Sequence, residues 1–284
     1  MFQTDLLKGK NILITGGGTG LGKSMALRFA ELGANIIITS RRQEVLEQAA
    51  REIEKKGTKV FFKTADVRNY DQVEDVFSAS EKELGPVDIL VNNAAGNFIS
   101  PTELLSPNAF QSIVGIVLNG SFHATLAAGR RWINSQRGGR VLSIATTYAF
   151  TGSAYVVPSA CAKAGVVAMT RSLAVEWAKY KIRLNAIAPG PFPTDQAWKN
   201  LVPEGFEEKW RKRIPLGRSG RHEELANLAA YLVSDYADYI NAEVVTIDGG
   251  EWVQGAGEMN MLTEMEPEDW AKMAERFAKS KEKK

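Results

Sequence analysis

A glycine-rich loop is the part of the sequence whose residue types and spacing most directly indicate chemistry. Gly16, Gly20 and Gly22 stand between a short apolar run and a segment with apolar residues at helical spacing. Glycines in such a turn let backbone N–H groups approach a pyrophosphate at the positive end of a helix. They also serve ordinary tight turns, but their place between a strand and a helix favours a dinucleotide-binding loop.

The end of the second apolar run bears on which dinucleotide is bound. NAD-binding folds usually carry an acidic residue there for the ribose 2′-hydroxyl, whereas an arginine accommodates the 2′-phosphate of NADP. This sequence has Ser40, Arg41 and Arg42, and no acid before Glu44. A guanidinium pairs with phosphate through parallel hydrogen bonds, so the sequence predicts NADP as cofactor. The alternative is a solvated arginine pair at a helix start, where positive charge is mildly unfavourable.

Seven short apolar runs, separated by helical patterns, must position these loops. Runs of this length that alternate with helices indicate βαβ units and a parallel sheet covered on both faces. No composition shift or Pro/Ser-rich linker divides the chain. The prediction is an α/β fold, a single doubly wound Rossmann-type domain, with strands at residues 11–15, 35–39, 60–64, 87–91, 140–144, 183–188 and 243–247.

A tail follows the last predicted strand. We expect one NADP-binding domain over residues 1–251 and a helical tail over 252–284. Pro267 suits the first turn of a helix, and Trp270, Met273, Ala274 and Phe277 follow at a spacing that gives one apolar stripe. The stripe is expected to pack on the domain or on a neighbouring subunit, and capping of a substrate is the alternative.

Composition narrows the class of protein. The chain has 284 residues with 35 Lys+Arg against 33 Asp+Glu, a net charge of +2, which argues against a nucleic-acid binder acting through its overall field. Hydrophobic residues at 44% and charged residues at 24% are ordinary for a globular protein, so disorder and coiled coil are excluded for the whole chain. No leader or long apolar run is evident, so a cytoplasmic protein with no membrane partner is expected.

Cysteine and histidine are scarce. The single cysteine, Cys161, rules out an intrachain disulfide, and we expect it to lie in the core. His123 and His222 stand in no motif, and structural roles are expected for both. No metal site is predicted.

Several motifs together resemble the short-chain dehydrogenase/reductase family. Thr15 to Gly22 has the form T-G-x-x-x-G-x-G, residues 92–96 resemble the family's N-N-A-G segment, and residues 189–192 resemble its P-G loop. Asp66 resembles the aspartate that binds the adenine amino group, and residues 248–250 resemble the end of the closing strand. The resemblance implies cofactor contacts from Gly16, Thr19, Gly20, Leu21, Arg41, Arg42, Asp66, Val67, Asn93, Ala94, Lys163, Pro189, Gly190 and Phe192.

The catalytic positions depart from that family's common pattern. Most members carry a tyrosine four residues before the catalytic lysine. Here the lysine is Lys163 and the fourth residue before it is Ser159, while Thr146 replaces the usual serine. Tyr148, at the end of the strand predicted over residues 140–144, is instead placed where a parallel sheet presents active-site residues.

This arrangement resembles the 2,4-dienoyl-CoA reductases of the mitochondrial type, over nearly the whole chain. The likeness extends to residues 96–101, 105–107, 116–120, 151–153 and 156–159. It implies reduction of a 2,4-dienoyl-CoA by NADPH to a 3-enoyl-CoA in unsaturated fatty-acid β-oxidation. The alternatives are a trans-2-enoyl-CoA reductase, another short-chain oxidoreductase, or a catalytically silent NADP-binding scaffold.

The resemblance also implies residue roles. Tyr148 and Asn97 would donate hydrogen bonds to the thioester oxygen, which gains negative charge when the conjugated system takes a hydride. Lys163 would hold the nicotinamide ribose, and Ser159, one helical turn away, would orient the cofactor.

Substrate contacts and assembly are implied by the same likeness. Arg68, Phe98 and Ser106 would contact the acyl-CoA, although Arg68 could instead reach the cofactor or lie on the surface. Asn200, beside Lys199, stands where the family has a further basic contact. A homo-oligomer, a tetramer by resemblance, is expected to use small residues of the helix over 159–180.

Overall fold

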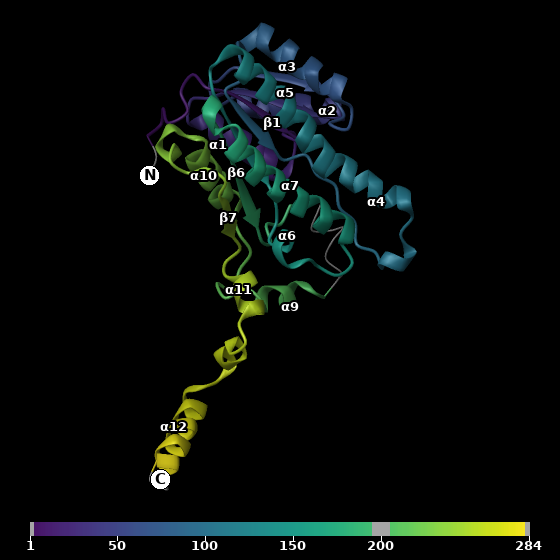
Figure 1. The fold of residues 1–284 in the computed structure, drawn as a ribbon. Coiled ribbons are helices and arrows are strands. Elements are labelled where there is room, and N and C mark those ends of the chain that lie inside the picture. The colour runs from purple at the N-terminus through teal and green to yellow at the C-terminus, as the bar shows by residue number, and fades with distance from the viewer. Residues whose placement is uncertain (1–2, 195–204, 282–284) are drawn as a thin grey trace.

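The computed structural model of the protein describes residues 3–194 and 205–281. Within them, a parallel sheet of seven strands runs in the order β3-β2-β1-β4-β5-β6-β7 (Figure 1). The strands are β1 (Asn11–Thr15), β2 (Asn35–Ser40), β3 (Val60–Thr64), β4 (Ile89–Asn92), β5 (Gly139–Ile144), β6 (Ile182–Pro189) and β7 (Val244–Ile247).

All seven predicted strands are confirmed, with ends that differ from the prediction by at most two residues. Their β-branched composition suits a pleated surface that is buried on both faces. Successive side chains of β2 point to opposite faces, because Ile36 and Ile38 lie in one hydrophobic core and Ile37 lies in the other. The α/β doubly wound fold class is therefore confirmed.

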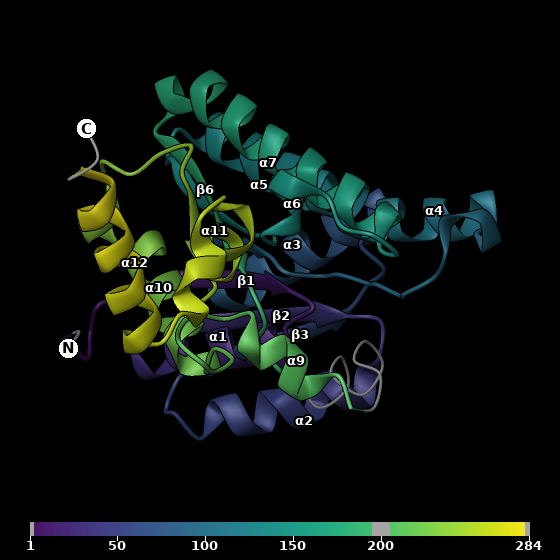
Figure 2. The same ribbon diagram turned by 90° about the horizontal axis from the view of Figure 1, so that it is seen from below.

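Helices cover both faces of the sheet (Figure 2). Residues of α1, α2 and α10 line one core, and residues of α3, α5 and α7 line the other. The α-helices are α1 (Gly20–Glu31), α2 (Gln43–Glu54), α3 (Tyr70–Leu84), α4 (Pro107–Val114), α5 (Gly120–Ser135), α6 (Tyr148–Thr151), α7 (Val157–Glu176), α9 (Glu207–Lys212), α10 (His222–Val233), α11 (Glu251–Ala256) and α12 (Pro267–Lys281). Short 3-10 segments lie at Thr102–Leu104, Ala178–Tyr180, Asp235–Ala237 and Asn260–Glu264.

The strand order places a switch point beside β1. The chain passes from β1 outward to β2 and β3, and then crosses to β4 on the other side of β1. In open α/β sheets, ligands bind outside the carboxyl ends of the strands at such a point. Thr15 at the end of β1 is in register with Thr39 of β2, and Asn92 of β4 with Ser143 of β5, so four strand ends meet at this edge.

One helical stretch is long and apolar enough to cross a membrane by length and composition. It joins α4, the π-helical segment η2 (Gly115–Asn119) and α5 over Pro107–Ser135, with a mean hydropathy of 1.3 in its most apolar window. In the fold its residues Val117, Ala124 and Ala128 are buried in the hydrophobic cores. The apolar composition of this stretch is thus used for packing within the domain.

The C-terminal segment leaves the sheet. After β7, the short helix α11 stays near the domain, whereas α12 extends away from it (Figure 1). No residue of α12 is buried, and Trp270 and Phe277 are 47% and 59% exposed. The helix predicted from Pro267 is confirmed, but its apolar stripe is not packed on its own domain. Packing on a neighbouring subunit stays a prediction, as does the domain division at residue 251.

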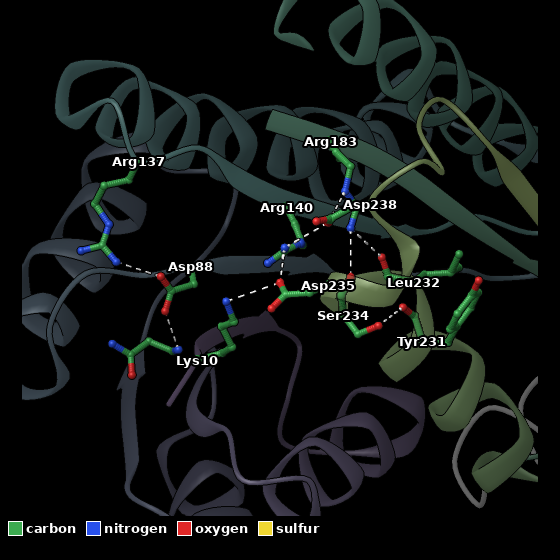
Figure 3. A network of polar contacts seen from close by, with 11 residues as sticks. Lys10, Asp88, Arg137, Arg140, Arg183, Tyr231, Leu232, Ser234, Asp235 and Asp238 are labelled. Carbon is green, nitrogen blue, oxygen red and sulfur yellow. Dashed lines mark hydrogen bonds and ion pairs between the residues drawn. The ribbon is translucent and has the colours of Figure 1, made fainter. Parts of the chain in front are cut away.

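An ionic network joins the amino ends of the strands, at the opposite edge from the switch point (Figure 3). Arg140 of β5 pairs with Asp235 and with Asp238, at 3.2 Å in the second case. Arg183 of β6 pairs with Asp238 at 3.4 Å and donates to three backbone carbonyls near the end of α10, those of Leu232, Ser234 and Ile240. Burial lowers the pKa of the Arg183 guanidinium. Arg183 therefore adds a side-chain donor to the carbonyls at and after the end of α10.

Replacing Arg183 tests this network. We expect Arg183→Met to lower the free energy of unfolding by about 2–4 kcal/mol, because it removes three hydrogen bonds to backbone carbonyls and the ion pair with Asp238. Arg183→Lys should recover only part of the loss, since an ammonium cannot reproduce the guanidinium fork. Denaturant unfolding measures both. Stability of Arg183→Met within 1 kcal/mol of the wild type would show that the contacts are dispensable.

Candidate active site

A cavity of about 260 Å³ opens at the switch point. It is lined by the loops that follow β1, β2, β3 and β4. Eight of the residues predicted to bind the cofactor meet here from separate parts of the sequence. These are Gly16, Thr19, Arg41, Arg42, Asp66, Val67, Asn93 and Ala94.

The glycine loop fits the close approach of a pyrophosphate. A Cβ on Gly22 would lie 2.4 Å from the carbonyl oxygen of Gly16, and one on Gly17 would lie 2.5 Å from a methyl of Ile38. Gly16 and Gly20 have φ of +66° and +52°, which side-chain-bearing residues rarely adopt. Only glycine therefore permits this turn to bring its backbone N–H groups to the start of α1.

Asn93 and Thr15 fix the two central loops against each other. The side-chain amide of Asn93 donates to the carbonyls of Thr15 and Gly16, at 3.1 Å in both cases. The Thr15 hydroxyl accepts the backbone N–H groups of Asn93 and Ala94, at 3.0 and 3.1 Å. Asn93 thus acts on the glycine loop through its side chain, a role that its predicted cofactor contact did not include. Thr15 was not predicted as a site residue, although its position directly before Gly16 in the glycine-rich motif could have indicated this role.

The rim beyond β2 has the donors that a phosphate requires. Arg41 and Arg42 line the cavity, and their side chains are exposed. The Ser40 hydroxyl oxygen is buried at the same wall, with no hydrogen-bond partner among the described residues. This set of groups fits an adenosine ribose that carries a 2′-phosphate.

Asp66 is engaged by its own neighbour. Its carboxylate accepts hydrogen bonds from the Arg68 guanidinium, with Nε 3.0 Å from both oxygens. The Arg68 guanidinium also lowers the pKa of the Asp66 carboxyl. Arg68, predicted as a substrate contact, is exposed and lies beside Asp66 at the rim of the cavity. Its contact with the substrate or the cofactor stays a prediction.

The P-G loop follows β6 on the other side of the switch point. Gly190 lies so close to Asp248 that an added Cβ would be 2.6 Å from the aspartate Cβ. The ring of Phe192 packs on Gly220, and Pro189 is buried at the end of β6. Leu21, also a predicted cofactor contact, packs against the core beneath α1.

Tyr148, Ser159 and Asn97 converge at the ends of β4 and β5. The Tyr148 hydroxyl lies 3.0 Å from the Ser159 hydroxyl and 3.4 Å from the side-chain nitrogen of Asn97. The Asn97 side-chain oxygen accepts the backbone N–H of Phe98 at 2.9 Å, which turns its NH₂ group toward Tyr148. Ser159 contacts the tyrosine hydroxyl directly, and its predicted role in orienting the cofactor stays a prediction.

Lys163 lies one turn beyond Ser159 on α7 and is buried. Its ammonium donates to the backbone carbonyl of Ile144, at the end of β5. Burial lowers the pKa of this ammonium to about 8, and no carboxylate pairs with it in the described parts of the chain. The ammonium is thus poorly solvated and has donors left for a ligand at the strand ends.

Comparisons with known proteins bear on this arrangement. A family model described as enoyl-(acyl carrier protein) reductase matches residues 16–251. A short chain dehydrogenase from Bacillus anthracis, solved as a crystal structure, is 46% identical with a TM-score of 0.78, over 86% of this chain and 96% of that one. The chain belongs to the short-chain dehydrogenase/reductase family.

Curated members of this family are similar over most of their length. A probable 2,4-dienoyl-CoA reductase of Caenorhabditis elegans, (3E)-enoyl-CoA-producing, is 48% identical over 86% of this chain and 81% of the relative. A probable 2,4-dienoyl-CoA reductase of Bacillus subtilis, (2E)-enoyl-CoA-producing, is 47% identical over 86% of this chain and 97% of the relative.

Short-chain dehydrogenases/reductases use NAD or NADP, and the cavity agrees with that family property. A gluconate 5-dehydrogenase of Burkholderia cenocepacia, solved in complex with NADP and tartrate, is 31% identical with a TM-score of 0.82, over 87% of this chain and 97% of that one. Residues 15–22, 92–96 and 189–192 of this short-chain reductase carry the family's loops to the same edge of the sheet.

The other two predicted substrate contacts, Phe98 and Ser106, do not line the cavity. Phe98 is half-buried and packs on the small core of Ile113, Val117, Ala162 and Val166. The Ser106 hydroxyl accepts the N–H of Ala109 at 3.1 Å, as the N-cap of α4. Lys199 and Asn200 lie outside the described residues.

Two expectations about single residues are corrected or extended. Cys161 is exposed, not in the core, because it lies on the opposite side of α7 from Ser159 and Lys163. His222, for which no motif was found, contacts both α1 and the P-G loop. Among the described residues, no group of three or more His, Cys, Asp or Glu is arranged to hold a metal ion.

The burial of Lys163 has a stability cost that can be measured. At pH 7 the native state holds a charged ammonium in a poorly solvated place, so Lys163→Met should raise the free energy of unfolding by up to about 3 kcal/mol. As pH rises from about 8 to 10.5, the native lysine loses its proton while the unfolded lysine keeps it. The advantage of Lys163→Met should therefore shrink across this window.

Thermal and denaturant unfolding at pH 7 and 9.5 would measure both effects. Lys179→Met, at an exposed position beyond the end of α7, is the matched control and should change stability little at either pH. A Lys163→Met protein less stable than the wild type at pH 7 would show that the contact with Ile144 outweighs the desolvation of the ammonium.

Proposed function

We propose that the protein is an NADPH-dependent reductase of 2,4-dienoyl-CoA thioesters that yields 3-enoyl-CoA in unsaturated fatty-acid β-oxidation. The observation that carries this proposal is the convergence of Tyr148 and Asn97 while a serine, not a tyrosine, stands four residues before Lys163. Relatives whose names give this activity, at 47–48% identity, support it.

The chemistry explains why the tyrosine is displaced from its usual place beside the lysine. A ketoreductase must protonate an alkoxide on the carbon that accepts hydride. A dienoyl thioester accepts hydride at C5, far from its carbonyl, and the electron pairs shift until the negative charge lies on the thioester oxygen. That oxygen needs hydrogen-bond donors, and each donor of such an oxyanion hole is worth roughly 3–4 kcal/mol.

Tyr148 and Asn97 can supply those donors together. Their polar atoms lie 3.4 Å apart, so one oxygen to the side of the pair, about 2.9 Å from each, can accept from both. The Ser159 hydroxyl, 3.0 Å from that of Tyr148, can accept or donate and so holds the phenol in place. Stacking of Phe150 on Trp252, with ring centroids 4.9 Å apart, fixes the short helix α6 that begins at Tyr148.

Bound NADPH supplies the hydride. Gly16, Thr19, Arg41, Arg42 and Asp66 would hold its adenosine and pyrophosphate parts, and Lys163 its nicotinamide ribose. Proton addition at C2 of the resulting dienolate, from water, completes a 3-enoyl-CoA. The (2E)-producing relative shows that the same family also contains enzymes named for the other product, which needs the proton at C4.

Two alternatives are less well supported. A trans-2-enoyl-CoA reductase would use the same oxygen donors on a shorter conjugated system, and rates on the two thioesters separate them. A catalytically silent NADP-binding scaffold would have no need for Tyr148 to be bonded to Ser159 and Asn97.

Assembly is proposed to use the outer face of α7. Ala164 and Ala168 are exposed on this helix, and Val175 is 77% exposed. Ala160 and Ala162, which were also expected to contribute, are buried within the domain. The exposed small residues would let a second copy approach closely, and a homotetramer is the proposed state.

Removing the phenol tests the oxygen-donor role. Tyr148→Phe should lower kcat for 2,4-dienoyl-CoA by about 10²- to 10³-fold, because one donor to the developing oxyanion is lost. The dissociation constant of NADPH should stay within twofold. Tyr180→Phe, at an exposed position, is the matched control. Full activity of Tyr148→Phe would refute the mechanism.

Cofactor preference tests the role of Arg41. Arg41→Ala should weaken NADPH binding by about 10- to 100-fold through loss of a charged hydrogen bond, with little change for NADH. Fluorescence titration with each nucleotide measures this. Arg51→Ala, on the exposed face of α2, controls for the lost charge. Equal weakening for both nucleotides would contradict recognition of the 2′-phosphate.

A further inference from the structure

His222 joins two parts of the molecule that the family motifs leave unconnected. It is the first residue of α10 and is half-buried. Its Nε2 lies 2.7 Å from the carbonyl oxygen of Pro193, and its Nδ1 lies 2.9 Å from the hydroxyl of Ser24 in α1. The imidazole therefore bridges the P-G loop, taken from here on as residues 189–194, to the helix that follows the glycine loop.

The P-G loop depends on such contacts because of its composition. Pro189, Pro191 and Pro193 have no backbone N–H, so the loop must be anchored largely through its carbonyl groups. The carbonyl of Pro189 accepts from the N–H of Thr147 at 3.4 Å, and that of Pro191 from the N–H of Gly220 at 3.0 Å. For Pro193, the next in this series, the donor is the His222 side chain.

The bridge lies where the two cofactor loops approach each other. A Cβ on Gly20 would be 3.1 Å from the methyl group of Thr194, so the end of the P-G loop reaches the glycine loop. Ser24 is one helical turn after Gly20, and its hydroxyl is also 3.0 Å from the Gly20 carbonyl oxygen. His222 thus connects Pro193 to the same turn of α1 that Thr194 approaches.

We propose that His222 is a positioning residue that holds the P-G loop against the start of α1, in the arrangement that binds the nicotinamide half of the cofactor. This proposal rests on the cofactor role given above to the two loops, and not on the identity of the thioester substrate. His222 acts through Pro193 and Thr194 and need not touch the nucleotide itself.

The hydrogen-bond pattern identifies a substitution that should preserve the bridge. A carbonyl only accepts, so His222 Nε2 donates to Pro193, and Nδ1 can accept when the Ser24 hydroxyl turns its one proton from the Gly20 carbonyl toward the ring. A glutamine amide offers the same pair, an N–H donor and an oxygen acceptor. His222→Gln can therefore reproduce both contacts, whereas His222→Phe keeps the ring shape and loses both.

Fluorescence titration of the full-length protein with NADPH tests the proposal without any turnover. We expect His222→Phe to raise the dissociation constant by about 3- to 10-fold and His222→Gln to stay within twofold of the wild type. The thermal midpoint of the nucleotide-free proteins should be similar in both variants. Glu223→Gln, the next residue of the same helix turn, is exposed and serves as the matched control.

Steady-state kinetics give a second readout. His222→Phe should raise the KM for NADPH and leave the KM for 2,4-dienoyl-CoA and the kcat at saturating NADPH nearly unchanged. Unchanged NADPH affinity of His222→Phe, or a weakening that His222→Gln shares, would overturn the proposal. If the wild type binds NADPH but reduces no dienoyl-CoA, the proposed function fails while the titration still decides the role of His222.

Discussion

A buried ammonium group is the constraint around which the active site is arranged. Lys163 donates to the Ile144 carbonyl, at the end of a central strand, and burial lowers its pKa to about 8. Keeping a charge in such a place is unfavourable for folding, so the surrounding sheet and helices must hold it there by packing. We propose that the buried ammonium serves to donate hydrogen bonds to the nicotinamide ribose.

The same helix carries the second requirement. Because Ser159 precedes Lys163 by one turn on α7, fixing the lysine also fixes the serine, and the serine holds the Tyr148 hydroxyl. Asn97 reaches the tyrosine from the loop after β4, with its amide oriented by the N–H of Phe98. Three elements thus place two donors at one point, and the glycine loop and the P-G loop lie at the same edge of the sheet.

Much of this could be predicted from the sequence, since it depends on local patterns. Short apolar runs between helical patterns predicted all seven strands, and Tyr148 and Asn97 were expected together by resemblance to a known arrangement. What the sequence did not indicate depends on contacts between distant segments. His222 and Pro193 are 29 residues apart, and the exposure of Cys161 depends on which face of α7 the core covers.

One departure from the sequence prediction also has a physical reason. The apolar stripe of α12 was expected to be buried, but the helix lies beyond the last strand, out of reach of the domain's cores. An amphipathic pattern indicates that the apolar face of a helix is to be covered, but it does not identify the surface that covers it.

Isotope labelling of the product tests the central claim most directly. The enzyme would reduce a 2,4-dienoyl-CoA with NADPH deuterated at the transferring C4 position, and in a parallel reaction with unlabelled NADPH in deuterated water. The account predicts a 3-enoyl-CoA with nucleotide deuterium at C5 and solvent deuterium at C2, as read by NMR. A 2-enoyl-CoA with solvent deuterium at C4, or nucleotide deuterium at C3, would contradict it.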